Sequence, residues 1–127
     1  MRIYFPGGKK VYAEYKEFTI RTDQPVKEGG GGTDPAPFDL FVASIGTCAG
    51  IYVLGFCQQR GISTEGIEVI QSVVKDPESN LIDRVRLEIN LPSDFPKKYK
   101  NAIVKAAELC TVKKHLENPP RFTVVTT

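Results

Sequence analysis

The stretch LFVASIGTCAGIYVLGFC, residues 40–57, contains no charged side chain. Its length allows a membrane-spanning helix. Glycines interrupt it at Gly46, Gly50 and Gly55, however, and short strand-like patterns flank it on both sides. A helix buried on most of its circumference inside a soluble domain accounts for the same residues. We therefore expect a central core helix that ends near Gly61, and no membrane partner.

Alternating apolar and polar residues before this helix indicate an antiparallel meander. Residues 2–5, 9–15 and 17–22 read as three strands separated by turn residues. Residues 26–34 include four consecutive glycines and are expected to form a flexible loop. Thr33 or Asp34 then caps the helix, with proline in its first turn.

The pattern after the helix predicts a hairpin, a second helix and a final strand. Residues 67–74 and 81–91 alternate in polarity around a turn at residues 76–80. A second helix is expected from Ser93 or Asp94, then a helical turn from Cys110 to Leu116, and a last strand from Phe122 to Val125. The order βββ-α-ββ-α-β is α+β, and residues 1–127 are expected to form a single domain.

Composition excludes several classes of function. The 127 residues carry 17 basic and 15 acidic side chains, a net charge of +2. Nucleic-acid binding is not expected, because the basic residues do not gather on one face. The glycine loop lacks the Gly-Lys-Ser/Thr ending of a phosphate-binding loop, so no nucleotide cofactor is expected. No secretory signal is evident, and the cysteine spacing suits neither zinc nor a disulfide framework, so we expect a cytoplasmic location.

Three cysteines are the residues most able to carry chemistry. Cys48 and Cys57 are nine residues apart and face opposite sides of the helix, so they cannot readily act as a pair. Cys110 lies where one helix ends and another turn begins, a place where free N–H groups stabilise a thiolate. Burial as a small apolar residue is the alternative for each cysteine. His115, the single histidine, is expected at the surface, and no metal site is expected.

The segment DPAPFDLFVASIGTCAG, residues 34–50, resembles the central-helix signature of the OsmC/Ohr family of osmotically inducible and organic hydroperoxide resistance proteins. The shared features are a proline-led helix start, a Leu-Phe pair, small residues, and a cysteine eight positions after the leucine, here Leu40 and Cys48. The second cysteine of the family follows a strand pair and a helix, and Cys110 occupies that position. The resemblance covers essentially the whole chain.

This resemblance implies an intertwined homodimer with active sites at the subunit interface. It also implies reduction of organic hydroperoxides or hydrogen peroxide without a metal or other cofactor. Cys48 would be the peroxidatic thiolate, which becomes a sulfenic acid. Cys110 would resolve that acid as a disulfide, and an external dithiol would reduce the disulfide.

Characterised family members activate the thiolate with an arginine from the N-terminal strands and a glutamate early in the central helix. Here Phe38 occupies the glutamate position, with Asp39 adjacent. Lys9 and Lys10 lie near the expected arginine, and Arg21 aligns one strand later. Asp39 and these three cations are the candidate activating residues.

Two other functions remain open at this point. In the first, the chain is a binding module. Its pocket lies around Cys48, is covered by Phe38, Phe41 and Tyr52, and holds a small apolar or acyl ligand. In the second, either family cysteine transfers a sulfur or acyl group, assisted by His115.

Overall fold

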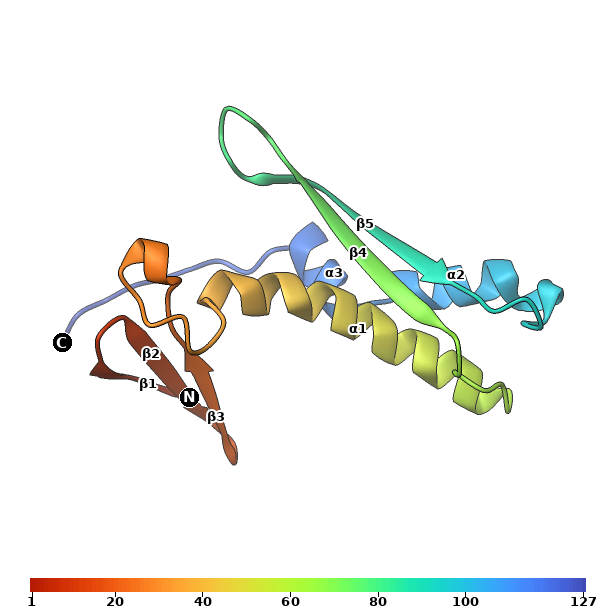
Figure 1. Cartoon of the computed structure of the whole chain (residues 1–127), viewed down its shortest axis with the longest axis horizontal. Helices are drawn as coiled ribbons and strands as arrows, with labels where there is room; N and C mark the ends of the chain where they lie inside the picture. Colours follow the sequence, from red (N-terminus) through yellow and green to blue (C-terminus); the bar gives the residue numbers. More distant parts are fainter. The chain divides into compact units, whose positions relative to one another are not determined.

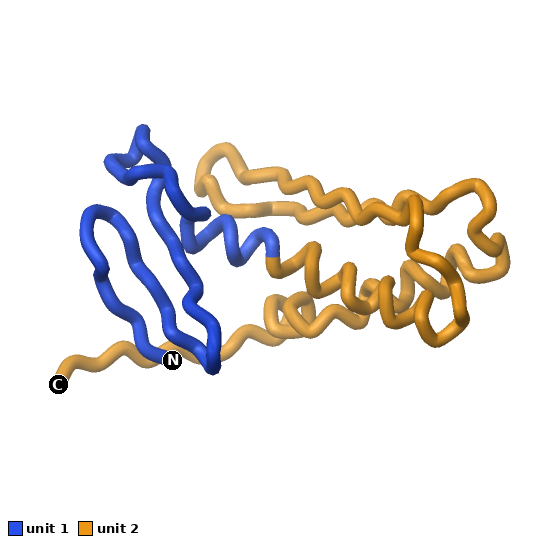
Figure 2. The backbone as a smooth tube through the Cα atoms, turned by 60° about the horizontal axis from the view of Figure 1, so that its bottom comes forward, with its two compact units in different colours: residues 1–43 blue, residues 44–127 orange.

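The computed structural model describes all 127 residues and divides into two compact units, residues 1–43 and 44–127 (Figure 2). Helix α1 (Pro37–Gln59) begins in the first unit and continues into the second. Strands and helices are combined as expected, so the α+β class is confirmed. The description of residues 1–127 as a single domain stays a prediction.

The first unit is a three-stranded antiparallel sheet in the order β1-β2-β3 (Figure 1). Its strands are β1 (Arg2–Gly7), β2 (Lys10–Tyr15) and β3 (Phe18–Thr22), which confirms the three expected strands. Because side chains alternate between the faces of a strand, the register puts Ile3, Ala13 and Ile20 on one face and Tyr4, Tyr12 and Arg21 on the other.

A buried carboxylate organises the glycine-rich loop. Asp23 is only 1% exposed, and its oxygens accept hydrogen bonds from the backbone N–H groups of Gln24, Gly31 and Thr33 and from the Thr33 hydroxyl. Within the loop, Val26–Glu28 form a short 3-10 helix, η1. The loop is therefore folded around Asp23, and its expected flexibility stays a prediction.

The start of α1 is set by Asp39. Its carboxylate accepts the Ala36 N–H at 2.9 Å, and Pro37 takes the first helical position, where its missing N–H costs nothing. Thr33 instead donates to Asp23 and Asp34, so the expected cap at Thr33 or Asp34 is wrong. The helix ends at Gln59, before Gly61, whose φ of +63° suits glycine.

The second unit packs a hairpin on helices. Strands β4 (Glu68–Lys75) and β5 (Ile82–Asn90) pair antiparallel, as expected. They are followed by the 3-10 helix η2 (Lys97–Tyr99) and by helices α2 (Lys100–Glu108) and α3 (Thr111–Glu117). Inner hairpin residues pack against a buried cluster from α1, α2 and the adjoining loops; the cluster is Ala49, Val53, Phe56, Cys57, Phe95, Ile103, Ala107 and Cys110.

Helix α1 approaches the hairpin closely at one glycine. A Cβ atom at Gly46 would lie 2.6 Å from the Gln71 side-chain oxygen of β4, whereas a Cβ atom at Gly50 would meet nothing within 4 Å. By length and composition α1 also passes as a membrane span, with a mean hydropathy of 2.0, and mostly buried core helices of soluble proteins pass the same test. Here only 28% of the 18-residue window is buried, so the expected burial of the helix on most of its circumference is wrong for the single chain.

The last expected strand is not formed. Residues 119–127 carry no helix or strand, and Phe122 is 87% exposed. The sheet of the second unit has two strands only, and no segment of the chain pairs with the C-terminal residues. A β-prone sequence without a ladder partner has no hydrogen bonds to hold it as a strand, which explains the difference from the prediction.

Candidate functional site

Two thiols meet inside the second unit. Cys48 is half-buried in the middle of α1, and Cys110 is 1% exposed at the junction between α2 and α3. Cys110 is also the N-cap residue of α3, because its sulfur accepts the Lys113 N–H. The structure thus brings together the two cysteines that the sequence singled out, although 62 positions separate them.

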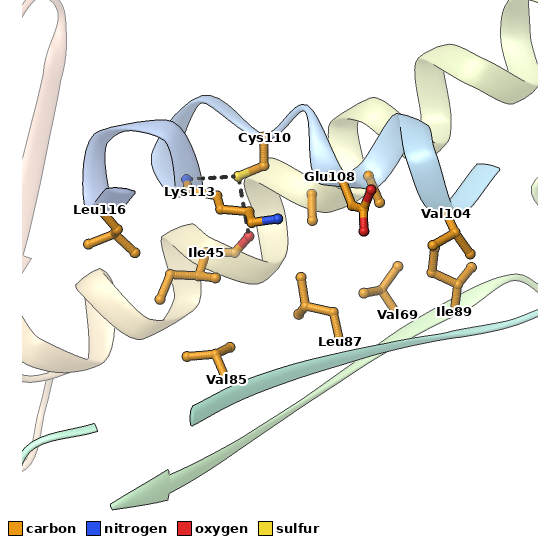
Figure 3. A pocket seen from close by; sticks show the side chains of 12 residues that line it. Ile45, Val69, Val85, Leu87, Ile89, Val104, Glu108, Cys110, Lys113 and Leu116 are labelled. Atoms are coloured by element: carbon orange, nitrogen blue, oxygen red, sulfur yellow. Dashed lines mark hydrogen bonds between the residues drawn. The ribbon is translucent and has the colours of Figure 1, made fainter. Parts of the chain in front are cut away.

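The Cys110 sulfur is held on both sides by main-chain groups (Figure 3). It accepts the Lys113 N–H at 3.4 Å, and its single S–H proton has two acceptors beside it, the Ile45 carbonyl oxygen at 3.9 Å and the Cys48 sulfur. Burial raises the pKa of this thiol, and the neighbouring Cys48 raises it further, while the N–H groups of Lys113 and Val112 oppose both effects only in part. Burial and the neighbouring Cys48 thus outweigh the helix-start N–H groups, which do favour the Cys110 thiolate as expected, and the pKa of Cys110 lies above its ordinary value.

The pKa of Cys48 is shifted in the opposite direction to that of Cys110. Burial alone would raise the pKa of the Cys48 thiol. Hydrogen bonds from the Val112 N–H, the Cys110 thiol and the Thr111 N–H outweigh burial, and the pKa lies below its ordinary value. All three donors are uncharged. Of the two thiols, Cys48 is therefore the one that ionises first, and Cys110 stays protonated beside it.

Each thiol has its own cavity. Cys48 lines a groove of about 550 Å³ that runs between α1 and the junction of α2 with α3; its other lining residues are Ile51, Tyr52, Gly55, Phe56, Gln59, Ala106, Leu109 and Thr111. Cys110 lines a cavity of about 380 Å³ between the helices and the hairpin. Figure 3 shows Val85, Leu87 and Val69 pointing from the strands into this cavity, and Glu108 and Lys113 are its charged residues.

Thr111 connects the groove to the residues around it. The Tyr52 hydroxyl lies 3.0 Å from the Thr111 hydroxyl, so one of the two donates to the other. His115 Nδ1 lies 2.8 Å from the Thr111 carbonyl oxygen, one helical turn away. His115 is exposed and does not line the Cys48 groove, as expected of a surface residue.

The candidate activating residues lie in the first unit. Asp39 is engaged as the helix-start carboxylate, and the Arg21 guanidinium lies 5.4 Å from the centroid of the Tyr12 ring. Lys10 begins β2, and Lys9 precedes it in the turn. None of these four is among the groups that set the pKa of Cys48. Their role in activation stays a prediction.

The predicted pocket aromatics are divided between the two units. Phe38 and Phe41 lie in the first turns of α1, with ring centroids 5.5 Å apart, and belong to the first unit. Tyr52 lines the Cys48 groove in the second unit. Cys57 is fully buried in the core, and burial raises its pKa, so it has the contacts of a packing residue.

Sequence reasoning missed the groups that stabilise the Cys48 sulfur. The N–H groups of Thr111 and Val112 are main-chain donors, which every residue except proline carries, so residue identity does not reveal them. The usable signal was the start of a helical turn at Cys110, which places free N–H groups near that cysteine. No group of three or more His, Cys, Asp or Glu side chains is arranged to hold a metal ion.

The fold and the paired thiols define an α+β protein with a two-cysteine site. The OsmC-like protein family model matches residues 29–125, and the chain belongs to this family. This confirms the resemblance drawn from the central helix and the cysteine spacing. No match is found among curated proteins.

Two solved structures show the same fold. A protein of Psychrobacter arcticus 273-4, described as an osmotic stress induced and detoxification response protein, is similar with a TM-score of 0.73 and 21% identity over 89% of this chain and 84% of that one. An organic hydroperoxide resistance protein OsmC of Legionella pneumophila, described as a predicted redox protein and regulator of sulfide bond formation, has a TM-score of 0.55 and 20% identity over 91% and 85% of the two chains.

Proposed function

We propose that the chain is a thiol-dependent peroxidase that reduces organic hydroperoxides or hydrogen peroxide. The observation that carries this proposal is the unequal pair of thiols, because a lowered pKa activates the first nucleophile and a second thiol beside it is placed to resolve the sulfenic acid. Cys48 has the lowered pKa and Cys110 the raised one. Membership of the OsmC-like family supports the same chemistry.

The reaction would proceed in three balanced steps. The Cys48 thiolate attacks the outer oxygen of the peroxide; an S–O bond forms, the O–O bond breaks, and the leaving alkoxide takes a proton and departs as an alcohol, or as water from hydrogen peroxide. Cys48 is then a sulfenic acid. Cys110 loses its proton and attacks that sulfur, so that a disulfide forms and water leaves. An external dithiol reduces the disulfide by two exchanges and becomes a disulfide itself.

The surroundings of the thiols favour alkyl hydroperoxides within this class. The Cys48 groove is lined mainly by apolar side chains and the Tyr52 ring, which suit an alkyl or aryl group next to the attacked oxygen. The Legionella pneumophila relative, an organic hydroperoxide resistance protein by name, supports this choice. A cytoplasmic location fits the cycle, since dithiol reductants are kept reduced there.

Peroxide consumption by cysteine variants tests the proposal. With cumene hydroperoxide and dithiothreitol in excess, the wild type and Cys57→Ser should turn over at similar rates, and Cys48→Ser should not turn over. With dithiothreitol left out, Cys110→Ser should consume a first equivalent of peroxide and then accumulate over-oxidised Cys48 as more peroxide is added. Full turnover by Cys48→Ser, with the rate of Cys57→Ser as the reference, would refute the mechanism.

We further propose that the protein acts as a homodimer. Large exposed apolar surfaces mark interaction sites, and each unit carries apolar side chains that a second copy of the chain would cover. Exposed apolar side chains occur in both units, among them Phe5, Phe18, Ile51 and Leu109. Light scattering after gel filtration should give twice the chain mass; the mass of a single chain would contradict this.

A second candidate function is binding of a small apolar or acyl ligand. The cavity of about 380 Å³ next to Cys110 favours it, because the lining is aliphatic apart from Cys110 and the charged Glu108 and Lys113. Native mass spectrometry with added octanoate should then show a bound species. A spectrum of the free protein alone, in the presence of excess octanoate, would count against this function.

A further inference from the structure

One hydrogen bond joins the wall of the Cys48 groove to the segment that stabilises its sulfur. Tyr52 follows Cys48 by four residues on α1, so the two side chains lie on the same side of the helix. The Tyr52 hydroxyl reaches across the groove to the Thr111 hydroxyl at 3.0 Å, a normal hydrogen-bond distance. The contact of Cys110 with Ile45 between the same two regions is longer, at 3.9 Å.

Thr111 is also a source of the donors around the Cys48 sulfur. The N–H of Thr111 and that of the next residue, Val112, both favour the charged form of Cys48. Thr111 directly follows Cys110, which donates the third hydrogen bond. A bond that fixes the Thr111 side chain to α1 therefore fixes the distance of two amide donors from the thiolate.

We propose that Tyr52 is a positioning residue: through its hydrogen bond to Thr111, it holds the amide groups of Thr111 and Val112 against Cys48 and so maintains the reactivity of that thiolate. The inference rests on the proposed function only in that Cys48 is taken as the reactive thiol. Tyr52 itself need not touch the peroxide. It acts on the charge of the nucleophile before any substrate binds.

The other titratable side chains of α2 and α3 are not among the causes of the Cys48 pKa shift. Cys110 is the titratable residue among the causes that set the pKa of Cys48. The remaining titratable residues of α2 and α3 are absent from those causes; they are Lys100, Lys105, Glu108, Lys113, Lys114, His115 and Glu117. The pH dependence of Cys48 reactivity therefore reports mainly on the amide donors and on Cys110.

The test is the pH profile of Cys48 alkylation by iodoacetamide, measured peptide by peptide in the fully reduced protein. Tyr52→Phe removes one oxygen, and Thr111→Val removes its partner. Each should move the midpoint of the profile to higher pH and slow alkylation at pH 7 by roughly threefold to tenfold, the effect of one net hydrogen bond. The double variant should lose no more than either single one, because both remove the same bond.

Two control variants separate positioning from a general loss of structure. Thr111→Ser keeps the hydroxyl and should keep the wild-type profile. Tyr15→Phe removes a tyrosine hydroxyl in the first unit and should also leave the profile unchanged. A wild-type profile for Tyr52→Phe would overturn the proposal, as would a shift in Thr111→Val alone. Because iodoacetamide needs no peroxide, this outcome is independent of whether the chain turns over peroxide.

Discussion

Replacing Ile103 by alanine tests whether the packing of α2 in the buried cluster stabilises the second unit, which carries the thiol pair. Ile103 is 0% exposed and belongs to the same buried cluster as Cys57 and Cys110. Cys110 follows the end of α2 by two residues, so the position of its sulfur depends on how firmly that helix is packed.

The expected cost follows from the atoms removed. Ile103→Ala deletes three carbons, which are worth roughly 2.4 kcal/mol at ~0.8 kcal/mol each, before any term for the cavity left behind. With that cavity the loss in unfolding free energy should be about 3–4 kcal/mol, inside the usual range for such changes. That is a large share of the roughly 5–15 kcal/mol that stabilises an ordinary domain.

Urea unfolding followed by circular dichroism, at one protein concentration for all variants, measures this loss. The midpoint should fall by roughly 1–4 M, since the unfolding free energy of small proteins falls by ~1–3 kcal/mol per molar urea. The matched control is the neighbouring Val104→Ala: Val104 is 49% exposed, and its loss should cost less than about 1 kcal/mol. Equal midpoints for the two variants would refute the packing account of the second unit.

Three further predictions concern single residues. Gly50→Ala should stabilise the helix by up to about 1 kcal/mol, whereas Gly46→Ala should be less stable than Gly50→Ala, because its new methyl group displaces the Gln71 side chain; thermal melting compares the two. Hydrogen bonds to the Asp23 carboxylate, above all from the Gln24 N–H, hold its pKa below the ordinary value. The ionised Asp23 therefore contributes its full stability to the fold above the unfolded pKa of ~3.9, and this contribution is lost as the pH falls through the lower folded pKa. Asp23→Asn should remove this contribution, so that unfolding free energy depends less on pH in the acid range. Cys57 should be the last cysteine alkylated in the native protein, because burial protects it and raises its pKa.

Much of the fold was predictable because it follows from periodicity. The alternation of Val85, Leu87 and Ile89 predicted an inner hairpin face, and the structure directs these residues at the helices. The long uncharged stretch predicted α1, whose observed end at Gln59 lies close to the end predicted near Gly61. The pairing of Cys48 with Cys110 came from the resemblance to the OsmC/Ohr family, and in the structure the Cys110 thiol is one of the groups that lower the pKa of Cys48.

Other features depend on contacts that the sequence does not encode locally. Thr33 is a residue type that often caps helices, but its hydroxyl donates a hydrogen bond to Asp23, ten positions away in the sequence. Phe122 to Val125 have strand propensity but find no partner strand in the chain. Burial and the neighbouring Cys48 raise the pKa of Cys110 by more than the helix N–H groups lower it, and neither of these two causes is visible from the position of Cys110 at a helix start.

The most direct test of the central claim is to map disulfides by non-reducing peptide mass spectrometry before and after one equivalent of cumene hydroperoxide. The mechanism predicts rapid loss of two thiols and a Cys48–Cys110 disulfide, with Cys57 still reduced. Thiols that all persist for minutes, or oxidation that joins Cys57 rather than Cys110 to Cys48, would contradict it.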